Sequence, residues 1–554
     1  MRRGGAGERR RGATMRRAND DAGAKATAQA AFWLTALAVG VAAGYAAIGF
    51  RLSISALQGL FYGADDATIH SHAADLNPLV VIVIPILGGF AVGWVLKTFT
   101  PDGKALGVAD VIHAAALRDG RVDLRAGGAA AAAALITLSS GGSTGREGPV
   151  VHLAAVIASW TSERLKLHDL SARDILGCAA AAAVSASFNA PLAGALFALE
   201  VVLRHYAVHA FGPIVMASVA GAVISRTHMG DVTEFTLPAP TPGFYAELPA
   251  FALLGLLCGL AAVAMMRAIF VAERVGDRVQ RRLGLSTIQR PAFAGAVLGV
   301  IAVGFPHIIG VGYETTSRAL TMGLDFWACV AFAVVKVVAV AVTFAGRMGG
   351  GVFSPSLMLG ALTGAAFGAV ATGIFPAMAG EEGLYAMVGM GAVAAAVLGA
   401  PISTTLIVFE MTGDYQAAIA VMVATSLAAV VSQRLVRKSF FLTQLARAGV
   451  ALAAGPESWL PRTIAVRRLM RLRGSEDGVS DSAAQALVDQ GAYVTQDDTL
   501  AVALPLFERL KGAFLPVVEL RDGAAPELVG ALFHVDALKA MNRVLVETHQ
   551  EEHS

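Results

Sequence analysis

The chain has 554 residues, of which 56% are hydrophobic and 15% are charged, and its formal net charge is +2 at pH 7. Soluble proteins carry about 25% charged residues. The deficit here is concentrated in residues 30–440, so the composition excludes a soluble protein and predicts a polytopic membrane protein. Because the net charge is this close to zero, nucleic-acid binding cannot be predicted from an overall excess of positive charge.

The N-terminal segment, residues 1–29, has eight basic and three acidic side chains. We predict a cytoplasmic tail, because basic flanks of membrane spans stay on the cytoplasmic side. A signal-peptide n-region and a disordered tail are the alternatives. Translation starting at Met1 and at Met15 are both compatible with the sequence.

Residues 30–227 are predicted to form a first membrane repeat. Its apolar spans lie at 30–50, 78–97, 127–139, 149–160, 175–203 and 208–225. Several are shorter than the roughly 20 residues that a helix needs to cross a bilayer. Such half-spans are tolerated only where the backbone lines a cavity inside the protein.

One motif in this repeat opens a short apolar run. It consists of Gly145, Arg146, Glu147, Gly148 and Pro149. Glycine lets a backbone approach a ligand closely, and proline in the first turn presets a helix. A helix N-terminus presents unpaired N–H groups and a partial positive charge, so the motif has the build of an anion site.

Glu147 is the decisive residue of this motif. A carboxylate at membrane depth costs about 2.5–3.5 kcal/mol or more and is usually functional. Because Glu147 lies where N–H groups converge, it can occupy the place of an anion until protonation or a competing anion displaces it. A static ion pair with Arg146 is the alternative. His152 lies off the helical face of Glu147 and is interpreted as a hydrogen-bonded structural residue.

Residues 228–247 contain three prolines and three acidic residues, and they are predicted to form an extracytoplasmic linker. A second membrane repeat is predicted at 248–440. Its first loop, 274–290, carries five arginines and should therefore lie in the cytoplasm. Each half then crosses the membrane an odd number of times, which makes the repeat inverted. Cys178, Cys258 and Cys329 lie in apolar runs and are interpreted as buried small hydrophobic residues without disulfides.

The second repeat carries the motifs of the first. The counterpart of the 145–149 motif comprises Gly350, Gly351, Val352, Phe353, Ser354 and Pro355. Pro355 follows Pro149 at an offset of 355 − 149 = 206 residues. Segments 189–200 and 399–410 also match, at 401 − 191 = 210 residues. Broken helices in matching halves are the best sequence pointer to a transport site. The second match pairs Glu200 with Glu410 and favours a structural role for both, either capping a broken helix or pairing with a basic residue of a loop.

Residues 441–554 form a third region, in which charged residues return. Residues Thr499 to Ala540 are predicted to form a strand, a helix, two strands and a helix in this order, and this region, together with the segment 497–500 at its start, resembles a CBS module. The partner segment around 462–490 is short and poorly patterned. CBS modules usually pair and can bind adenine nucleotides. The resemblance implies a small cytoplasmic α/β regulatory region that binds a nucleotide or aids dimerisation.

Four segments together resemble the CLC family of chloride channels and proton/chloride exchangers. They are GREGP at 145–149, FNAPLAG at 188–194, GGGVFSP at 349–355 and EMTGDYQ at 410–416. The resemblance covers roughly residues 30–440. It implies an all-α inverted-repeat bundle with broken helices, and a homodimer with one pore per subunit. It also implies that Glu147 is the gating glutamate and that Val352 and Phe353 donate backbone N–H groups to a central chloride. Tyr415 is expected to donate its hydroxyl to the same ion, because a tyrosine buried at membrane depth needs a partner for its O–H group.

Two positions depart from the family pattern. Leu106 stands where a serine hydroxyl usually contacts the central anion, so the central site loses one donor and its preference for chloride is open. Val201 stands at the inner proton-relay position, where exchangers usually have a glutamate. Valine cannot carry a proton, which is similar to channel-type members, although some exchangers manage without that glutamate.

We therefore predict a multi-pass protein of the inner or plasma membrane, with both termini cytoplasmic, that conducts chloride or similar anions along a Glu147-gated pathway. A proton/chloride antiporter is the alternative. An intramembrane enzyme using Glu147 and His152, and a membrane-anchored nucleotide sensor, are more remote. The His-Glu-x-x-His spacing of zinc proteases is absent from the sequence. No enzyme activity, cofactor or metal site is predicted. The expected partners are anions, the lipid bilayer, a second copy of the chain, and an adenine nucleotide at the C-terminal region.

Overall fold

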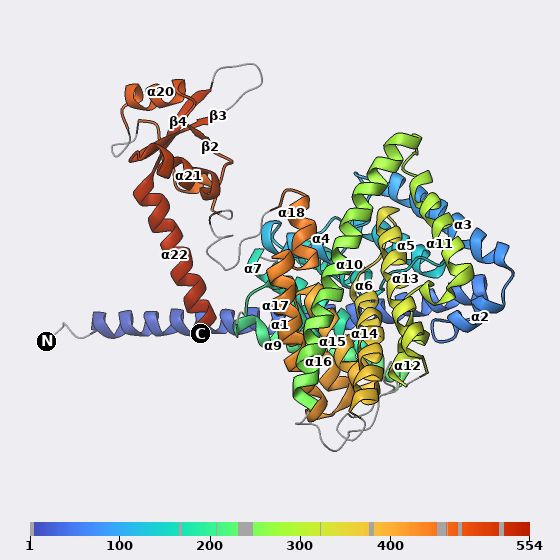
Figure 1. Cartoon of the computed structure of the whole chain (residues 1–554). Coiled ribbons are helices and arrows are strands. Elements are labelled where there is room, and N and C mark those ends of the chain that lie inside the picture. Colours follow the sequence, from blue (N-terminus) through green and yellow to red (C-terminus); the bar gives the residue numbers. More distant parts are fainter. Residues whose placement is uncertain are drawn as a thin grey trace. The chain divides into compact units, whose positions relative to one another are not determined.

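The computed structural model describes residues 5–165, 169–206, 208–230, 247–321, 323–375, 382–450, 461, 464–474, 479–519 and 526–553. It divides into two compact units (Figure 1). The first holds most of the chain up to Gln444, and the second holds Leu445–Ser554 with two short stretches, 116–118 and 204–211. Most of the predicted linker, residues 231–246, lies outside the described residues, as do the side chains of residues 1–26.

The first unit is built from helices in two successive series. The first series is α1 (Gly5–Tyr62), α2 (Ile69–Asp75), α3 (Pro78–Phe99), α4 (Val108–Leu117), α5 (Leu124–Ser139), α6 (Glu147–Leu165), α7 (Asp169–Phe188), α8 (Pro191–Phe197), a π-helical turn (Ala198–Leu203) and α9 (Val208–Met229). The second is α10 (Leu248–Leu283), α11 (Gln289–Gly304), a 3-10 turn (Pro306–Ile308), α12 (Tyr313–Leu320), α13 (Phe326–Ala345), α14 (Phe353–Ile374), α15 (Glu382–Leu398), α16 (Pro401–Thr412) and α17 (Tyr415–Val436). Helix α18 (Phe440–Arg447) follows.

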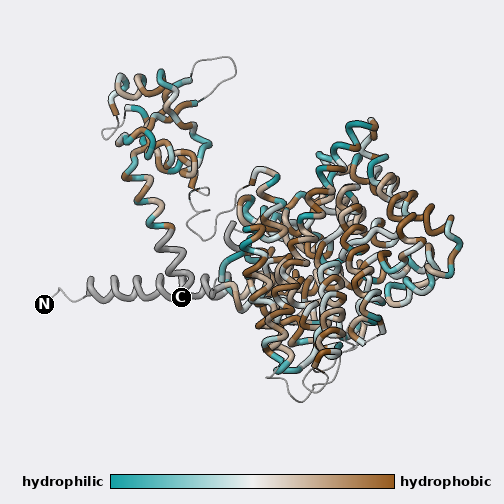
Figure 2. The backbone as a smooth tube through the Cα atoms, in the orientation of Figure 1, coloured by the Kyte–Doolittle hydropathy of each residue, from teal (hydrophilic) through white to brown (hydrophobic). Residues whose placement is uncertain are grey.

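The helices divide into long and interrupted ones, as predicted. Within the described residues, seven helices are long and apolar enough to cross a membrane, and five other apolar helices have only 10–17 residues. Figure 2 shows hydrophobic residues throughout this unit. Large apolar side chains such as Leu253 and Trp327 point outward and are exposed, which suits contact with lipid. The prediction of an all-helical membrane bundle with broken helices is confirmed.

Two glutamates tie the halves together by capping each other's short helices. The Glu410 carboxylate accepts the N–H groups of Leu192 and Ala193, at 2.8 and 2.7 Å, at the start of α8. The Glu200 carboxylate accepts those of Ile402 and Ser403, at 3.1 and 2.8 Å, at the start of α16. The N–H groups of a first helical turn have no partner within their own helix. The prediction that Glu200 and Glu410 cap broken helices is therefore confirmed.

Small residues let α14 and α15 approach closely. A Cβ atom added to Gly364 would lie 2.1 Å from the carbonyl oxygen of Tyr385, and one added to Gly360 would lie 2.3 Å from that of Gly389. Helix packing in membranes relies on such close contacts, because lipid offers no hydrophobic drive between helices. The glycines of the run after Pro355 thus fix α14 against α15.

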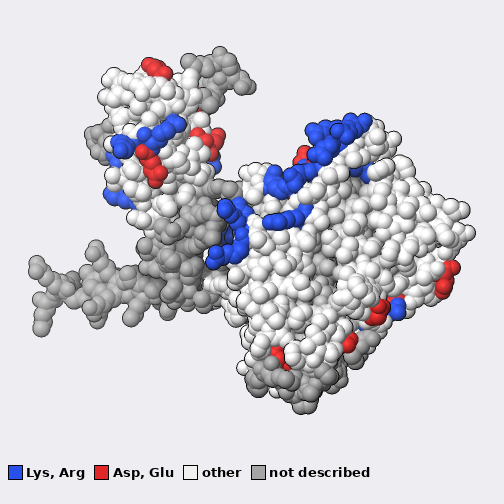
Figure 3. All heavy atoms as spheres, in the orientation of Figure 1, with Lys and Arg blue, Asp and Glu red and all other residues white. Residues whose placement is uncertain are grey.

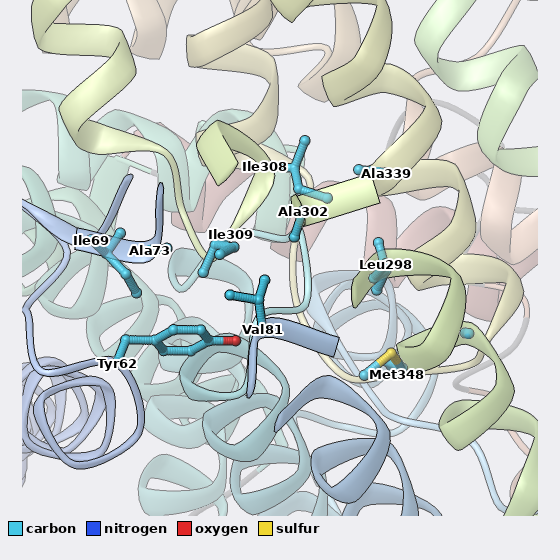
Figure 4. Close-up of a cluster of buried hydrophobic side chains, with 11 residues drawn as sticks. Tyr62, Ile69, Ala73, Val81, Leu298, Ala302, Ile308, Ile309, Ala339 and Met348 are labelled. Atoms are coloured by element: carbon cyan, nitrogen blue, oxygen red, sulfur yellow. The ribbon is translucent and has the colours of Figure 1, made fainter. Parts of the chain in front are cut away.

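A buried apolar cluster holds the 3-10 turn that precedes α12 (Figure 4). Its residues come from α1, α2, α3, α11, α13 and two loops, and they are Tyr62, Ile69, Ala73, Val81, Ala294, Leu298, Ala302, Ile308, Ile309, Ala339 and Met348. Ile308 and Ile309 bring the turn itself into this cluster. The segment that leads into α12 is therefore anchored on its apolar side.

Basic side chains gather at one end of the first unit, along the last turns of α10 (Figure 3). The Arg267 guanidinium donates to the carbonyl of Leu435 at 3.1 Å, which places the end of α17 beside α10. Arg290 donates to the carbonyl of Ala345 at 2.7 Å and pairs with Asp277 at 2.6 Å. The end of α13 therefore lies at the same end of the unit.

The second unit contains one four-stranded sheet in the order β1-β4-β3-β2. Its strands are β1 (Arg471–Leu472), β2 (Val494–Thr495), β3 (Phe514–Glu519) and β4 (Glu527–Phe533), and its helices include α20 (Asp481–Asp489), α21 (Leu500–Leu510) and α22 (His534–His553). Strands β3 and β4 are antiparallel, while β2 and β3 are parallel.

One part of the C-terminal prediction is wrong. The strand expected from Thr499 is reduced to a single bridge between Thr499 and Ala465, because helix α21 begins at Leu500, and the strand lies earlier, at Val494–Thr495. The helix, two strands and helix that follow are confirmed. The segment expected to be a weak partner module contributes β1 to the same sheet.

Candidate functional site

The two glycine motifs cross backbone to backbone inside the first unit, where Gly145 and Gly351 are both buried. Gly145 and Gly351 exchange both of their backbone hydrogen bonds, at 2.8 and 2.9 Å, in an antiparallel bridge. Gly350 has φ of +143°, and a Cβ atom there would lie 2.1 Å from the Thr144 hydroxyl oxygen, so only glycine fits. The crossing brings the first turns of α6 and α14 together, as the repeated motifs predicted.

Glu147 lies at this crossing, and its side chain is buried, with 1% of the residue exposed. Its Oε2 accepts the N–H of Ser354 at 3.3 Å, and its Oε1 accepts the hydroxyl of Ser354. The hydroxyl of Tyr313 donates to Oε1 at 3.2 Å, and Arg146 Nε lies 4.0 Å from the same oxygen. The carboxylate is thus bound at the N-terminus of α14, where the helix dipole favours a negative charge.

Val352 and Phe353 begin α14 and are buried. The Phe353 ring packs against those of Phe188 and Phe197, with centroids 4.7 and 6.1 Å apart. The side chains of Val352 and Phe353 therefore serve apolar packing. Only their backbone N–H groups could bind an anion, because the N–H groups of a first helical turn have no acceptor within the helix. Phe188 lies in the FNAPLAG segment, so a third motif also reaches the site.

The start of α4 also lies at the crossing. A Cβ atom on Gly148 would lie 3.7 Å from Cγ2 of Val108, the first residue of α4. Asp110 accepts the N–H of Gly107 at 2.8 Å and so orders the loop before the helix. Leu106, in this loop, is half-buried and brings an aliphatic side chain where the family pattern has a hydroxyl.

The expectation of a buried Tyr415 is wrong. Tyr415 is 69% exposed at the start of α17, and Asp414 caps that helix by accepting the N–H of Gln416 at 2.8 Å. The argument that a buried Tyr hydroxyl needs an ion as its partner therefore has no basis at this position. The tyrosine whose hydroxyl reaches Glu147 is Tyr313, 8% exposed, which the sequence analysis did not single out.

The structure also describes the surroundings of Val201 and His152, two residues singled out in the sequence. Val201 lies in the π-helical turn and is buried, while its neighbour Glu200 is used as the cap of α16. His152 is buried on α6, but neither of its ring nitrogens has a hydrogen-bond partner within the described residues, so its interpretation as a hydrogen-bonded residue is wrong. Its ring fills the space beside Gly127 on α5.

Lys336 is a second residue that the sequence analysis missed. It is completely buried in α13, and its Nζ donates to the carbonyls of Ile308, Gly310 and Val311 at 3.4, 3.2 and 3.4 Å. The signal was present: it is the one charged residue between Phe326 and Ala345. A lone ionisable group in a membrane span is a functional-site hypothesis by default.

Comparison with known proteins places these observations in a family. The model of a family described as voltage gated chloride channel matches residues 88–433. A putative chloride channel protein ClcB-like of Ralstonia nicotianae is 31% identical over 392 residues, covering 70% of this chain and 90% of that protein. The voltage-gated ClC-type chloride channel ClcB of Escherichia coli O9:H4 is 30% identical over 418 residues, covering 74% and 97%.

Solved structures share the fold. A slow cyanobacterial Cl−/H+ antiporter has a TM-score of 0.66 at 22% identity and covers 75% of this chain and 97% of its own. A eukaryotic CLC transporter has a TM-score of 0.62 at 18% identity and covers 91% and 97%. A CLC-type fluoride/proton antiporter has a TM-score of 0.63 at 21% identity and covers 74% and 97%.

Proposed function

Because the chain belongs to the voltage-gated chloride channel (CLC) family, we propose that it moves chloride or similar anions across the membrane along a pathway gated by Glu147. The observation that carries this proposal is the position of the Glu147 carboxylate at the N-terminus of α14. A carboxylate and a free anion seek the same N–H groups there, so each excludes the other.

The proposed gate works by competition. Ionised Glu147 occupies the anion site on Ser354 and blocks the pathway. Protonation removes its charge and hence its attraction to the helix dipole, and a free anion then takes its place. Val352 and Phe353 are proposed to donate backbone N–H groups to the central ion, and the Leu106 position adds no donor.

We favour a channel over the alternative, a proton/chloride antiporter. A coupled exchanger must carry a proton through the bundle, and the inner relay position is Val201, which is apolar and buried. Glu200 beside it already accepts two N–H groups of α16. Neither residue is proposed to accept a transported proton.

The orientation and assembly also belong to the proposal. We place the basic end of α10 in the cytoplasm, because basic loops are retained there, with both termini on that side and the protein in the inner or plasma membrane. A homodimer is proposed, with Leu192 and Ile402, each about half exposed at the starts of α8 and α16, available for contact with a second copy.

An adenine nucleotide at the C-terminal unit stays a prediction. The described part of this unit forms one sheet, and β1 of the segment expected as partner belongs to it. Calorimetric titration of the purified full-length protein with ATP tests the prediction. Binding with a stoichiometry of one per chain would support it, and the absence of any heat at millimolar ATP would remove it.

The proposed function is tested by reconstitution. Purified protein in liposomes should release chloride down its gradient, faster at low external pH, while a pH electrode in the same vessel records little proton movement. Vesicles without protein are the control. Absence of anion flux would overturn the proposal, and stoichiometric uphill proton movement driven by chloride would replace the channel with the antiporter.

A further inference from the structure

Tyr313 contacts both charged residues of the 145–149 motif. Its hydroxyl donates to Glu147 at 3.2 Å, and the Arg146 guanidinium carbon lies 4.7 Å from the centre of its ring. Arg146 is buried, and a desolvated guanidinium over an aromatic face is attracted to it. One aromatic side chain therefore holds the carboxylate with its polar end while its face holds the arginine.

The position of Tyr313 is fixed by the turn that precedes it. Gly312, with φ of +92°, is the residue before α12, and a Cβ atom there would meet Met358 of α14 at 2.4 Å and Lys336 Nζ at 3.3 Å. Lys336 binds three carbonyls of residues 308–311. On the other side, Ile308 and Ile309 are held in the apolar cluster of Figure 4.

The same turn is joined to the segment that carries Glu147. Gly310 and Ser143 form a backbone bridge, four residues before Glu147 in the chain. Asp66 lies close by, since a Cβ atom on Gly310 would be 3.3 Å from its carboxylate, and Asp66 accepts the amide of Gln58 at 2.8 Å. A buried acid and a buried base thus flank the turn that carries Tyr313.

We propose that Tyr313 is the latch of the gate and that Lys336 is the positioning residue that aims it; the inference rests on the proposed gating role of Glu147. The Tyr313 hydroxyl stabilises the ionised, blocking carboxylate, so the gate opens only when protonation outweighs this bond as well as those from Ser354. Lys336 acts on the gate indirectly: it binds the carbonyls of the turn and so fixes the position of Tyr313.

Among the groups around Glu147, Tyr313 is the hydrogen-bond donor whose replacement tests the proposal. Helix α14 brings no ionisable side chain to the site. Among the residues whose side chains the structure describes, the other Asp, Glu, His, Lys and Arg residues on α4, on α12 and on the helices packed against α6 are Arg51, Asp110, His113, Arg125, Arg173, Asp174, Glu314 and Arg318. Helix α6 itself adds His152, Glu163 and Arg164. Within the described residues, the side chains that contact the Glu147 carboxylate are those of Tyr313, Ser354 and Arg146.

The test is the pH profile of chloride efflux from liposomes containing Tyr313→Phe, which removes the hydroxyl and keeps the ring beneath Arg146. A hydrogen bond to a charged group is lost, so the pH of half-maximal flux should rise by about one unit. Tyr45→Phe is the matched control, because Tyr45 is 52% exposed on α1 and the same atom is removed. It should leave the profile of the parent unchanged.

Two further variants separate the latch from a general packing effect. Adding Tyr313→Phe to Glu147→Gln should change nothing more in the pH profile, because the carboxylate that the hydroxyl holds is gone. Lys336→Met should shift the midpoint in the same direction as Tyr313→Phe, if it folds. A parent that conducts with a pH-dependent gate but shares its profile with Tyr313→Phe overturns the latch. A parent without flux overturns the proposed function instead.

Discussion

At the scale of single residues, the gate depends on a carboxylate that cannot diffuse away. A tethered group competes at an effective concentration set by its short linker, in the millimolar range or above, whereas chloride must arrive from solution. The helix N-terminus binds either anion without a full positive charge of its own. Protonation is therefore the effective way to open the site, because it weakens the tethered competitor and leaves the free one unchanged.

Replacing Glu147 by Gln should abolish the pH dependence of flux. The amide has nearly the same shape but no charge to place on the N-terminus of α14, so flux should equal or exceed that of the parent at its most acidic pH. Chloride efflux measured from liposomes between pH 4 and 8 gives the result. A variant that keeps the parent's acid activation would show that another group is the gate.

The sequence predicted one side of this site and missed the other. The 145–149 motif carries its own signal, since glycine, a carboxylate and proline are adjacent at a helix start. The hydroxyl donor Tyr313 is 166 residues away and has no local pattern. Tyr415 was chosen as a tyrosine at membrane depth, and its exposure contradicts the buried environment expected for it. Long-range partners follow from the packing of the halves, which local spacing does not contain.

At the scale of elements, half-length helices are stabilised by groups outside them. Helices α8 and α16 have their first N–H groups satisfied by glutamates of the opposite half. Helices α6 and α14 start where two glycine backbones pair. In the membrane no water replaces a missing partner, so each of these contacts substitutes for the helical turn that a full span would have supplied.

Replacing Glu410 by Ala should destabilise the protein by about 0.5–2 kcal/mol, the usual cost of a lost helix cap. Glu200→Ala should cost a similar amount, and the double variant should lose roughly the sum, because the two caps share no atoms. Thermal unfolding in detergent measures the three values. Glu163→Ala, on the exposed face of α6, is the control and should stay within about 0.5 kcal/mol of the parent. Identical melting of Glu410→Ala and the control would refute the capping role.

Replacing Gly350 by Ala should prevent the motifs from crossing. The added carbon would overlap the Thr144 hydroxyl in a backbone conformation that L side chains rarely adopt. We expect loss of the monodisperse peak in size-exclusion chromatography after extraction. Gly373→Ala is the control, because a Cβ atom there meets nothing within 4 Å. Normal elution and flux of Gly350→Ala would show that the backbone crossing has room for a side chain at position 350, contrary to this prediction.

At the scale of the whole membrane unit, charge separates its two ends. Basic side chains mark one end of α10, and the end of α13 lies beside them through the bond from Arg290 to Ala345. Because α13 is long enough to cross the bilayer, its start at Phe326 lies at the opposite end. The repeat and this polarity were predictable from motif offsets and arginine positions. The single C-terminal sheet was not, because β1 and β2 have only two residues each.

The position of the basic end predicts which side of the membrane each end of the unit faces, and therefore which end a membrane-impermeant reagent reaches in intact cells. The three native cysteines are buried and should remain unlabelled, so the parent serves as the background. Arg282→Cys should react with a membrane-impermeant maleimide only after cells are opened, and Asp325→Cys, before the start of α13, should react in intact cells. The reverse pattern would invert the orientation, and labelling of both in intact cells would mean that the membrane was leaky.

The crossed caps bear on whether either half could fold without the other. A single half would leave the first N–H groups of its short helix without acceptors at membrane depth, and its own glutamate without donors. A second copy inserted upside down supplies both at once. Each half therefore depends on the other for the caps of its short helix. Residues before and after the linker, expressed as separate polypeptides, should therefore give a folded unit only when both are present.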